Sequence, residues 1–391
     1  MSFWGNGYPV GFPNIGIEFS SLPRGIEAFG FRIAFYGIII AIGMLCGIAI
    51  AKWQAKRSGQ DPEMYMDFAL IAIPVSVLGA RLYSVAFEWD LYKDDLLQIF
   101  NIRNGGLAIY GGIIAAFLCV FVYCKFKKYS FALFADTGVL GLILGQIMGR
   151  WGNFFNREAF GKYTDSLFAM KISCQDPSLG NVFKPDIISD ARLAELYAGK
   201  EKALANIMEI RDHIITAADG STYVSVQPTF LYESVWNLLL LIGMIVYWPK
   251  KKFNGEIFLM YVGGYGFGRF FIEGLRTDQL FLWNTGIPVS QLLAGIAFLV
   301  SAGLIVFFRI RVARGKLKLE TVAAGKAEKE KSGAETDNEG DVMEAEAIAE
   351  DSDGQTKDGN GQADNVETGG EKLRPLKVKA ETVEDKTGLW N

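Results

Sequence analysis

The chain has very little histidine and cysteine for its length of 391 residues. Its single histidine, His213, lies in a polar stretch, where a surface position is expected. Three of the four cysteines lie in apolar runs, where cysteine behaves as a small hydrophobic residue. Such scattered positions exclude the common zinc spacings and a disulfide framework. The sequence therefore predicts no metal site.

Charge is nearly absent from seven long segments, whereas half of all residues are apolar. A soluble protein spreads its apolar residues at helical or strand spacing, but these form runs of about 20, the length that crosses a bilayer as a helix. Helices satisfy their own backbone groups in lipid. The first run is too long for a cleavable signal peptide. We predict an all-α polytopic membrane protein with seven transmembrane helices, near 33–51, 65–87, 107–124, 131–148, 230–248, 256–272 and 289–308.

Basic residues mark alternate loops, and cytoplasmic loops are the ones enriched in lysine and arginine. The intervening loops hold few basic residues, mixed with aspartate. The pattern predicts an N-terminus outside the cell and a C-terminus in the cytoplasm. The predicted cytoplasmic basic residues are Lys52, Lys56 and Arg57, then Lys125, Lys127 and Lys128, then Lys250, Lys251 and Lys252, and finally Arg309, Arg311, Arg314, Lys316 and Lys318.

Four parts follow from this topology. Residues 1–32 form an extracytoplasmic N-terminal segment, and 33–310 form the membrane domain. A small extracytoplasmic head is expected at about 157–228, with helical spacing near 190–216. Residues 311–391 form a cytoplasmic tail, first basic and then acidic. From Glu320 onward the tail has 19 acidic and nine basic residues and few aromatics, so we expect a disordered, solvated tail rather than a partner-binding segment.

Polar residues gather at the outer ends of five of the predicted spans. Ionisable groups at membrane depth are costly and usually mark a site. Together they predict a binding site in the outer leaflet. The groups are Arg81, Tyr110, the segment 149–158 around Arg150, the segment 227–233 ending in Glu233, and the segment 265–273.

Two of these segments carry the most information. Tyr265, Arg269 and Glu273 are four residues apart and share one helix face, which also fits an internal ion pair that only fixes helix packing. Arg150 is flanked by glycines, and arginines at headgroup level form a clamp for a phosphate. Snorkelling toward lipid headgroups is the simpler alternative for a single arginine. It does not explain the neighbouring asparagines, Glu158 and the glycines.

Two classes of membrane protein without enzymatic activity, a transporter and a scaffold, must be weighed against this pattern. A transporter for an organic anion also uses buried polar groups, but near the midplane and between internal repeats. A non-catalytic scaffold needs no arginine or glutamate inside its spans, although the acidic tail suits one. The polar groups lie toward one leaflet, so they favour a binding site at the level of the lipid headgroups over both classes.

Four segments resemble the prolipoprotein diacylglyceryl transferase family, in family order. They are Tyr36-Gly37, residues 149–161 (GRWGNFFNREAFG), residues 227–233 (QPTFLYE) and residues 265–273 (YGFGRFFIE). The resemblance covers roughly residues 30–310 and leaves the tail and much of the head uncovered. It implies a bacterial plasma-membrane enzyme that needs no cofactor and has no nucleic-acid partner.

The implied reaction transfers diacylglyceryl from phosphatidylglycerol to the lipobox cysteine thiol of a preprolipoprotein, giving a thioether and glycerol 1-phosphate. Arg150 resembles the family's lipid-phosphate ligand, and Arg269 its second essential arginine. The resemblance assigns catalytic roles to Arg269, Tyr265, Glu273, Tyr110 and Glu158, and substrate binding to Arg150, Asn153, Tyr36, Tyr232, Glu233 and Gly161.

One departure from the family concerns the base. The family usually has His-Gly-Gly at the start of the third span, where this chain has Tyr110-Gly111-Gly112. The pKa of a histidine lies near neutral pH, whereas a tyrosine with a pKa of about 10 is a poor base. Either Glu273 or Glu158 accepts the thiol proton, or Tyr110 only orients lipid, so the sequence leaves the base unassigned.

Overall fold

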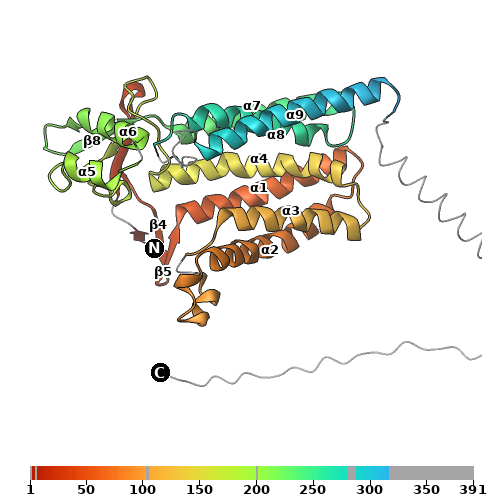
Figure 1. Cartoon of the computed structure of the whole chain (residues 1–391), viewed down its shortest axis with the longest axis horizontal. Coiled ribbons are helices and arrows are strands. Elements are labelled where there is room, and N and C mark those ends of the chain that lie inside the picture. The colour runs from red at the N-terminus through yellow and green to blue at the C-terminus, as the bar shows by residue number, and fades with distance from the viewer. Residues whose placement is uncertain are drawn as a thin grey trace, which may run out of the picture. The chain divides into compact units, whose positions relative to one another are not determined.

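A computed structural model describes residues 2–4, 7–102, 105–199, 201–277, 279 and 288–316. Within these residues, seven long helices run side by side, and strands with two shorter helices form a head at one end of them (Figure 1). Every predicted run corresponds to one helix. The long helices are α1 (Phe35–Arg57), α2 (Glu63–Phe87), α3 (Ile109–Phe126), α4 (Phe131–Asn156), α7 (Thr229–Tyr247), α8 (Glu256–Glu273) and α9 (Val289–Ala313).

Six of the seven long helices are long and apolar enough to cross a membrane. The exception is α8, which carries the charged residues Glu256, Arg269 and Glu273 in its 18 residues. The prediction of a mostly helical, multi-pass membrane protein is confirmed. The long helix outside this group of six is therefore one that delivers predicted site residues.

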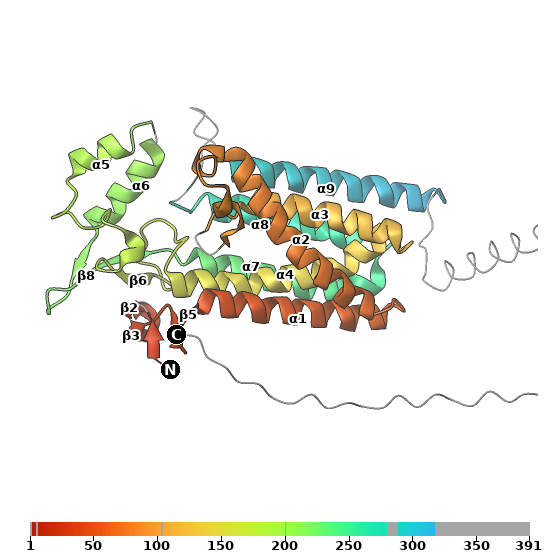
Figure 2. The same cartoon turned by 90° about the horizontal axis from the view of Figure 1, so that it is seen from below.

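Helix α4 lies between the other helices and packs closely on several of them (Figure 2). Its contact with α1 depends on two facing glycines. A Cβ on Gly47 would lie 2.7 Å from the carbonyl oxygen of Gly141, and one on Gly141 would lie 2.4 Å from that of Gly47. Small residues let membrane helices approach this closely. The other face of α4 packs on α7 and α8, which brings three polar helix ends together.

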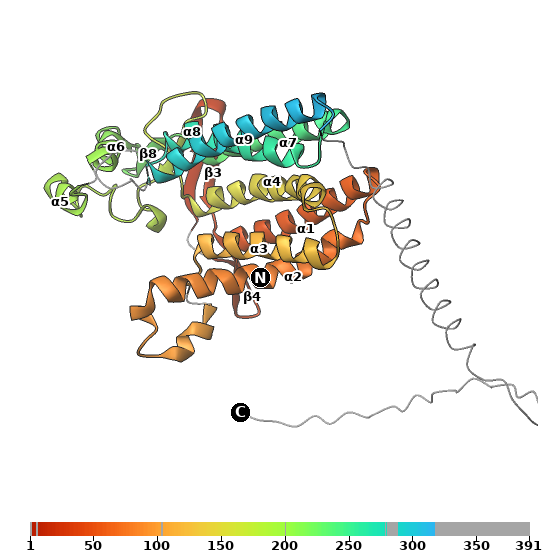
Figure 3. The same cartoon turned by 45° about the vertical axis from the view of Figure 1, so that its right-hand side comes forward.

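The N-terminal segment and the head contain two antiparallel sheets that the sequence analysis did not anticipate (Figure 3). One has the order β1-β4-β5, and the other has the order β3-β2-β6-β8-β7. The predicted helical spacing near 190–216 is borne out by α5 (Asp190–Leu196) and α6 (Glu201–Asp212). The strands are β1 (Ser2–Trp4), β2 (Tyr8–Phe12), β3 (Ile17–Leu22), β4 (Gly25–Ala28), β5 (Phe31–Ala34), β6 (Met170–Ser173), β7 (Ile215–Thr216) and β8 (Thr222–Val226).

Pairing between β2 and β6 joins the N-terminal segment to the head. Val10 lies opposite Ile172 in this pairing, so both segments occupy the same end of the helices. Four long helices separate them in the chain, and an even number of spans returns the chain to the same side. Phe154, near the end of α4, belongs to the apolar core of the head. The head is thus packed directly on the helix that carries Arg150.

At the opposite end of the helices, the buried carboxylate of Asp136 fixes the loop between α7 and α8. Asp136 of α4 accepts hydrogen bonds from the backbone N–H groups of Gly255 and Phe258, at 2.8 and 2.9 Å. Lys251 pairs with the same carboxylate at 3.1 Å. These contacts satisfy the first N–H groups of α8. Helix α9 continues to Ala313, into the predicted tail, and the prediction of a disordered tail otherwise falls on 317–391, outside the described residues.

Candidate functional site

The buried carboxylate of Glu233, near the start of α7, joins two arginines from different helices. Arg150 of α4 reaches one oxygen at 3.0 Å, and Arg269 of α8 reaches the other at 3.0 Å. The hydroxyl of Tyr265 donates to Glu233 at 3.2 Å. A carboxylate buried in a membrane protein needs such charged and hydrogen-bonded partners. Glu233 therefore fixes the position of both guanidinium groups.

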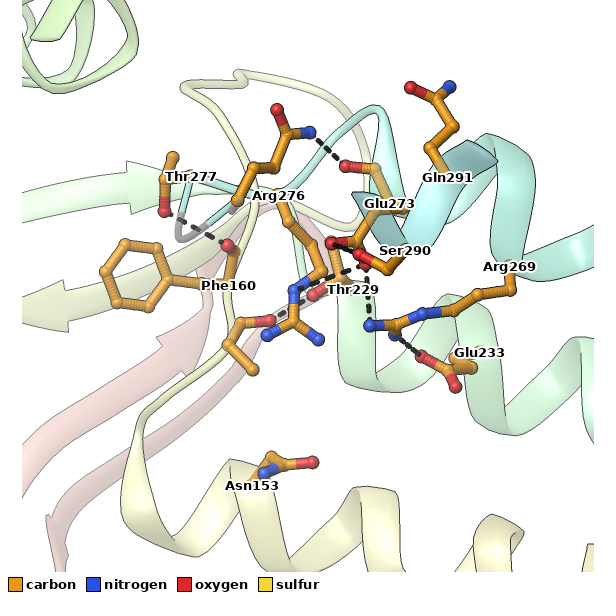
Figure 4. Close-up of polar contacts among 12 residues, drawn as sticks. Asn153, Phe160, Thr229, Glu233, Arg269, Glu273, Arg276, Thr277, Ser290 and Gln291 are labelled. Atoms are coloured by element: carbon orange, nitrogen blue, oxygen red, sulfur yellow. Dashed lines mark hydrogen bonds and ion pairs between the residues drawn. The ribbon is translucent and has the colours of Figure 1, made fainter. Parts of the chain in front are cut away.

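A second carboxylate holds Arg269 from the other side (Figure 4). Glu273, one helical turn along α8, lies 2.6 Å from Arg269 and accepts a hydrogen bond from the hydroxyl of Ser290 at 2.6 Å. The spacing of Tyr265, Arg269 and Glu273 predicted one shared helix face. The structure agrees, because Arg269 contacts Glu273 directly and Tyr265 through their common partner Glu233.

The end of α4 beside the head extends the cluster toward an exposed carboxylate. Arg150 donates to the side-chain oxygen of Asn153 at 3.3 Å, and Asn153 donates to Glu158 at 2.9 Å. Asn156 donates to the same oxygen of Glu158 at 3.2 Å. Among the described residues, nothing hydrogen-bonds the second oxygen of Glu158. An oriented, accessible carboxylate thus lies two hydrogen bonds away from Arg150.

The turn after α4 aims Glu158 back at the helix. Arg157 and Ala159 have positive φ angles of 56° and 57°, which non-glycine residues adopt only when their surroundings hold them there. Thr229 donates to the carbonyl of Ala159. Arg157 is fully buried, forms an ion pair with Asp176 and donates to the carbonyl of Leu22 at 2.7 Å. Burial lowers the pKa of Arg157, and the charge of Asp176 opposes that shift.

The sequence analysis missed the pairing of Arg157 with Asp176. Arg157 lies inside the recognised segment 149–161, but Asp176 lies in the uncovered head, and Arg24 binds the same carboxylate at 2.8 Å. No local pattern links these positions, because the three come from different parts of the chain. A buried arginine at a positive φ is a structural signal that a sequence does not show.

Two predicted site residues owe their positions to glycine. A Cβ on Gly152 would lie 2.4 Å from the ring of Tyr36, so only glycine lets this ring lie against α4. Gly161 donates to the carbonyl of Gln227 at 2.8 Å and bridges to Arg276. A Cβ there would lie 3.0 Å from the carbonyl oxygen of Leu275. These contacts connect the segment after α4 to the start of α7 and the end of α8.

Three residues of the predicted polar group lie apart from the cluster. Tyr110 is 60% exposed and Tyr232 is half-buried. Among the described residues, no hydrogen bond or ion pair joins the side chain of either tyrosine to the charged cluster. Arg81 donates to the carbonyls of Ile99, Gly105 and Gly106, each at 2.8 Å. It therefore holds the loop between α2 and α3 and is not a site residue.

The arrangement suits an anion. The side chains of Arg150 and Arg269 are 22% and 17% exposed, so they are partly desolvated and still reachable. Two arginines in such a setting can bind a phosphate by charge-assisted hydrogen bonds, and a nearby exposed carboxylate can accept a proton. Among the described residues, no group of three or more His, Cys, Asp or Glu side chains is placed to hold a metal ion.

Comparison with known proteins gives a consistent result. The family model for prolipoprotein diacylglyceryl transferase matches residues 23–307. A relative from Clostridium botulinum (strain Langeland) is 38% identical over 279 residues, which are 71% of this chain and 94% of the relative. A relative from Listeria innocua is 37% identical over 290 residues, which are 74% of this chain and 91% of the relative. Both are named phosphatidylglycerol–prolipoprotein diacylglyceryl transferase.

Proposed function

The chain belongs to the prolipoprotein diacylglyceryl transferase family, and from this premise we propose how its residues carry out the transfer. The protein is a multi-pass membrane transferase that moves the diacylglyceryl group of phosphatidylglycerol to a prolipoprotein, the first step of lipoprotein maturation. The acceptor atom is the thiol sulfur of the lipobox cysteine. The products are a thioether and glycerol 1-phosphate.

Arg150 and Arg269 bind the phosphate of the lipid. The observation that carries this role is their shared carboxylate, because Glu233 holds both guanidinium groups 3.0 Å away. Among the described residues, other N–H groups of both arginines have no partner, so they can bind a ligand. Both arginines lie in the last two turns of their helices, beside the head. A transporter site near the middle of the helices does not fit this placement.

The bond changes explain why two arginines are needed. The thiolate sulfur attacks the glyceryl carbon, and the bond from that carbon to the phosphate oxygen breaks. Its electron pair stays on the leaving phosphate, so negative charge grows between Arg150 and Arg269. A preorganised donor at such a position contributes about 3 kcal/mol to transition-state stabilisation. Tyr265 and Glu273 act by keeping Glu233 and Arg269 in place.

Glu158 accepts the proton of the cysteine thiol. Glu273 and Glu158 are the two carboxylates that could act as the base, and their surroundings differ. Glu273 is buried and engaged by Arg269 and Ser290, whereas Glu158 is exposed and has one oxygen free of hydrogen bonds from described residues. A base must reach the proton that it removes. The amides of Asn153 and Asn156 orient this carboxylate and connect it to Arg150.

The head and the N-terminal segment lie outside the cell, and the C-terminus is cytoplasmic. Two observations support this orientation. Strands β2 and β6 pair, so the N-terminal segment and the head share one side of the membrane. The loops at the other ends of the helices carry the clusters of lysine and arginine, which mark the cytoplasmic side. The tail, 311–391, follows α9 on that side.

A reconstituted assay tests the proposed function. Full-length protein in nanodiscs that contain phosphatidylglycerol is given a lipobox peptide, and the mass of the peptide is followed. We expect a gain equal to one diacylglyceryl group, with no gain for a peptide in which serine replaces cysteine. Folded protein that yields no thioether from phosphatidylglycerol and the cysteine peptide rules the function out.

A further inference from the structure

One helical turn farther from the head, helices α4, α7 and α8 each carry an uncharged polar residue. These three residues form what we call the inner layer. Residues four apart share a helix face and differ in height by about 6 Å. Each member lies four positions from a residue of the charged cluster: Gln146 from Arg150, Asn237 from Glu233, and Tyr261 from Tyr265.

Hydrogen bonding in the inner layer is incomplete. The amide of Gln146 donates to the hydroxyl of Tyr261 at 2.8 Å, and the ring of Tyr261 stacks on that of Tyr265 with centroids 5.7 Å apart. The buried amide oxygen of Gln146 has no partner among the described residues. Asn237 is 0% exposed, and neither atom of its amide has a partner in this part of the chain.

An unsatisfied amide in this position is costly. The buried face of α7 continues from Asn237 to Leu241 and Met244, which belong to an apolar core with residues of α4. A buried polar group without a hydrogen bond destabilises a protein, and an apolar side chain of the same shape avoids that loss. The position of Asn237 below the phosphate site therefore points to a polar ligand.

Gln146 also lies at an apolar groove between the long helices. It lines an apolar groove of about 470 Å³ between α1, α2 and α4, which extends as far as Ala51 and Phe134. The groove has the chemistry of an acyl chain's surroundings, and Gln146 is the amide at its edge. A molecule with both a neutral polar part and an apolar chain matches the two features together.

We propose that the inner layer binds the ester oxygens of the diacylglyceryl group that is being transferred. This inference rests on the proposed function, in which Arg150 and Arg269 hold the phosphate of the same lipid. In a glycerophospholipid the ester carbonyls lie a few bonds deeper than the phosphate, and they only accept hydrogen bonds. Asn237 supplies amide N–H donors at that depth. The site thereby selects a diester lipid over one with ether-linked chains.

The test compares two donors of equal chain length, dioleoyl phosphatidylglycerol and its di-O-oleyl ether analogue, with full-length protein and the same lipobox peptide. For the wild type we expect kcat/KM about three- to ten-fold higher with the diester, the value of one neutral hydrogen bond. For Asn237→Leu we expect that preference to disappear through a higher KM for the diester, with the ether donor used as before. Ile242→Leu, on the exposed face of α7, is the matched control and keeps the preference.

Thermal unfolding of the same variants separates binding from packing. Asn237→Leu removes an unsatisfied amide, so the proposal expects a melting temperature equal to or above that of the wild type. A lower melting temperature together with an equal loss for both donors gives Asn237 a structural role and overturns the proposal. So does a wild type that uses both donors equally, which leaves the transferase function standing. A wild type that forms no thioether with either donor overturns the transferase function itself.

Discussion

Glu233 of α7 binds Arg150 of α4 at 3.0 Å, so a buried carboxylate on one helix orients a guanidinium group on another. Removing the guanidinium deletes one preorganised donor from the site of growing negative charge. We expect Arg150→Ala to lower kcat at least a hundred-fold, the usual effect of losing such a donor, while the protein remains inserted. Thioether formation in the nanodisc assay measures the effect.

Arg150→Lys is the matched control for charge. Lysine keeps the positive charge but lacks the planar fork that binds Glu233, Asn153 and a phosphate together. We expect activity between those of the wild type and Arg150→Ala. Near-normal transfer by the alanine variant would remove Arg150 from the phosphate site.

Glu158→Gln tests the assignment of the base through pH. A free cysteine thiol has a pKa of about 8.5, so it is mostly protonated at neutral pH and mostly thiolate above about pH 9. Without its base, the enzyme depends on thiol that has already ionised. We expect a loss of about a hundred-fold near pH 7 that shrinks about thirty-fold by pH 9.5, relative to the wild type at each pH.

Glu273→Gln provides the comparison. Glu273 holds Arg269, so its loss impairs the phosphate site, and higher pH does not restore a misplaced guanidinium. Its deficit should stay nearly constant with pH. If Glu158→Gln behaves in the same way and Glu273→Gln recovers, the two roles are exchanged.

Tyr110→His restores the residue that the family usually has at this position. The Tyr110 side chain is 60% exposed and contacts no member of the charged cluster in the described part. We therefore expect kcat/KM to change by no more than about three-fold, since surface substitutions without lost contacts have small effects. Complete inactivation, measured with the same peptide, would give Tyr110 a specific role in the reaction.

Much of the membrane domain was predictable because helices in lipid leave long, uninterrupted apolar runs in the sequence. The shared face of Tyr265, Arg269 and Glu273 followed from their spacing alone, since an α-helix brings residues four apart together. The partnership of Arg150 with Glu233 did not follow in detail. It depends on how α4 packs against α7. Glycine pairs such as Gly47 and Gly141 set the distances between helices, but the sequence does not show which glycine pairs with which.

The head was less predictable for a different reason. Its strands are short and pair over long distances in the sequence, as Val10 does with Ile172. The N-terminal strands are too short for their alternation of apolar and polar residues to stand out beside the long apolar run of a membrane span. Arg81 was grouped with the site because charge at a helix end looks the same in a sequence whether it faces a ligand or, as here, the carbonyls of a loop.

The ion pair of Arg157 with Asp176 gives a prediction about the head. Arg157→Gly keeps the positive φ without strain but removes a fully buried partner of Asp176, which should destabilise the fold by about 3 kcal/mol. Arg157→Ala should cost about 1 kcal/mol more, because alanine also disfavours the left-handed conformation. Thermal unfolding measures both, and Arg24→Ala, which removes the partly exposed partner of Asp176, should cost less. If all three variants unfold at the same temperature as the wild type, Arg157 does not anchor the head.

Labelling of single cysteines tests the orientation of the chain. In sealed spheroplasts, a membrane-impermeant maleimide should label Ala218→Cys in the head at once and Lys127→Cys only after the membrane is opened. The native background is low, because Cys46 and Cys119 lie on the long helices α1 and α3, and Cys174 of the head is buried. Burial also raises the pKa of the Cys174 thiol, so at neutral pH even less of it is the reactive thiolate. The reverse labelling pattern would place Arg150, Arg269 and Glu158 in the cytoplasmic leaflet, where an extracytoplasmic lipobox cysteine does not reach them.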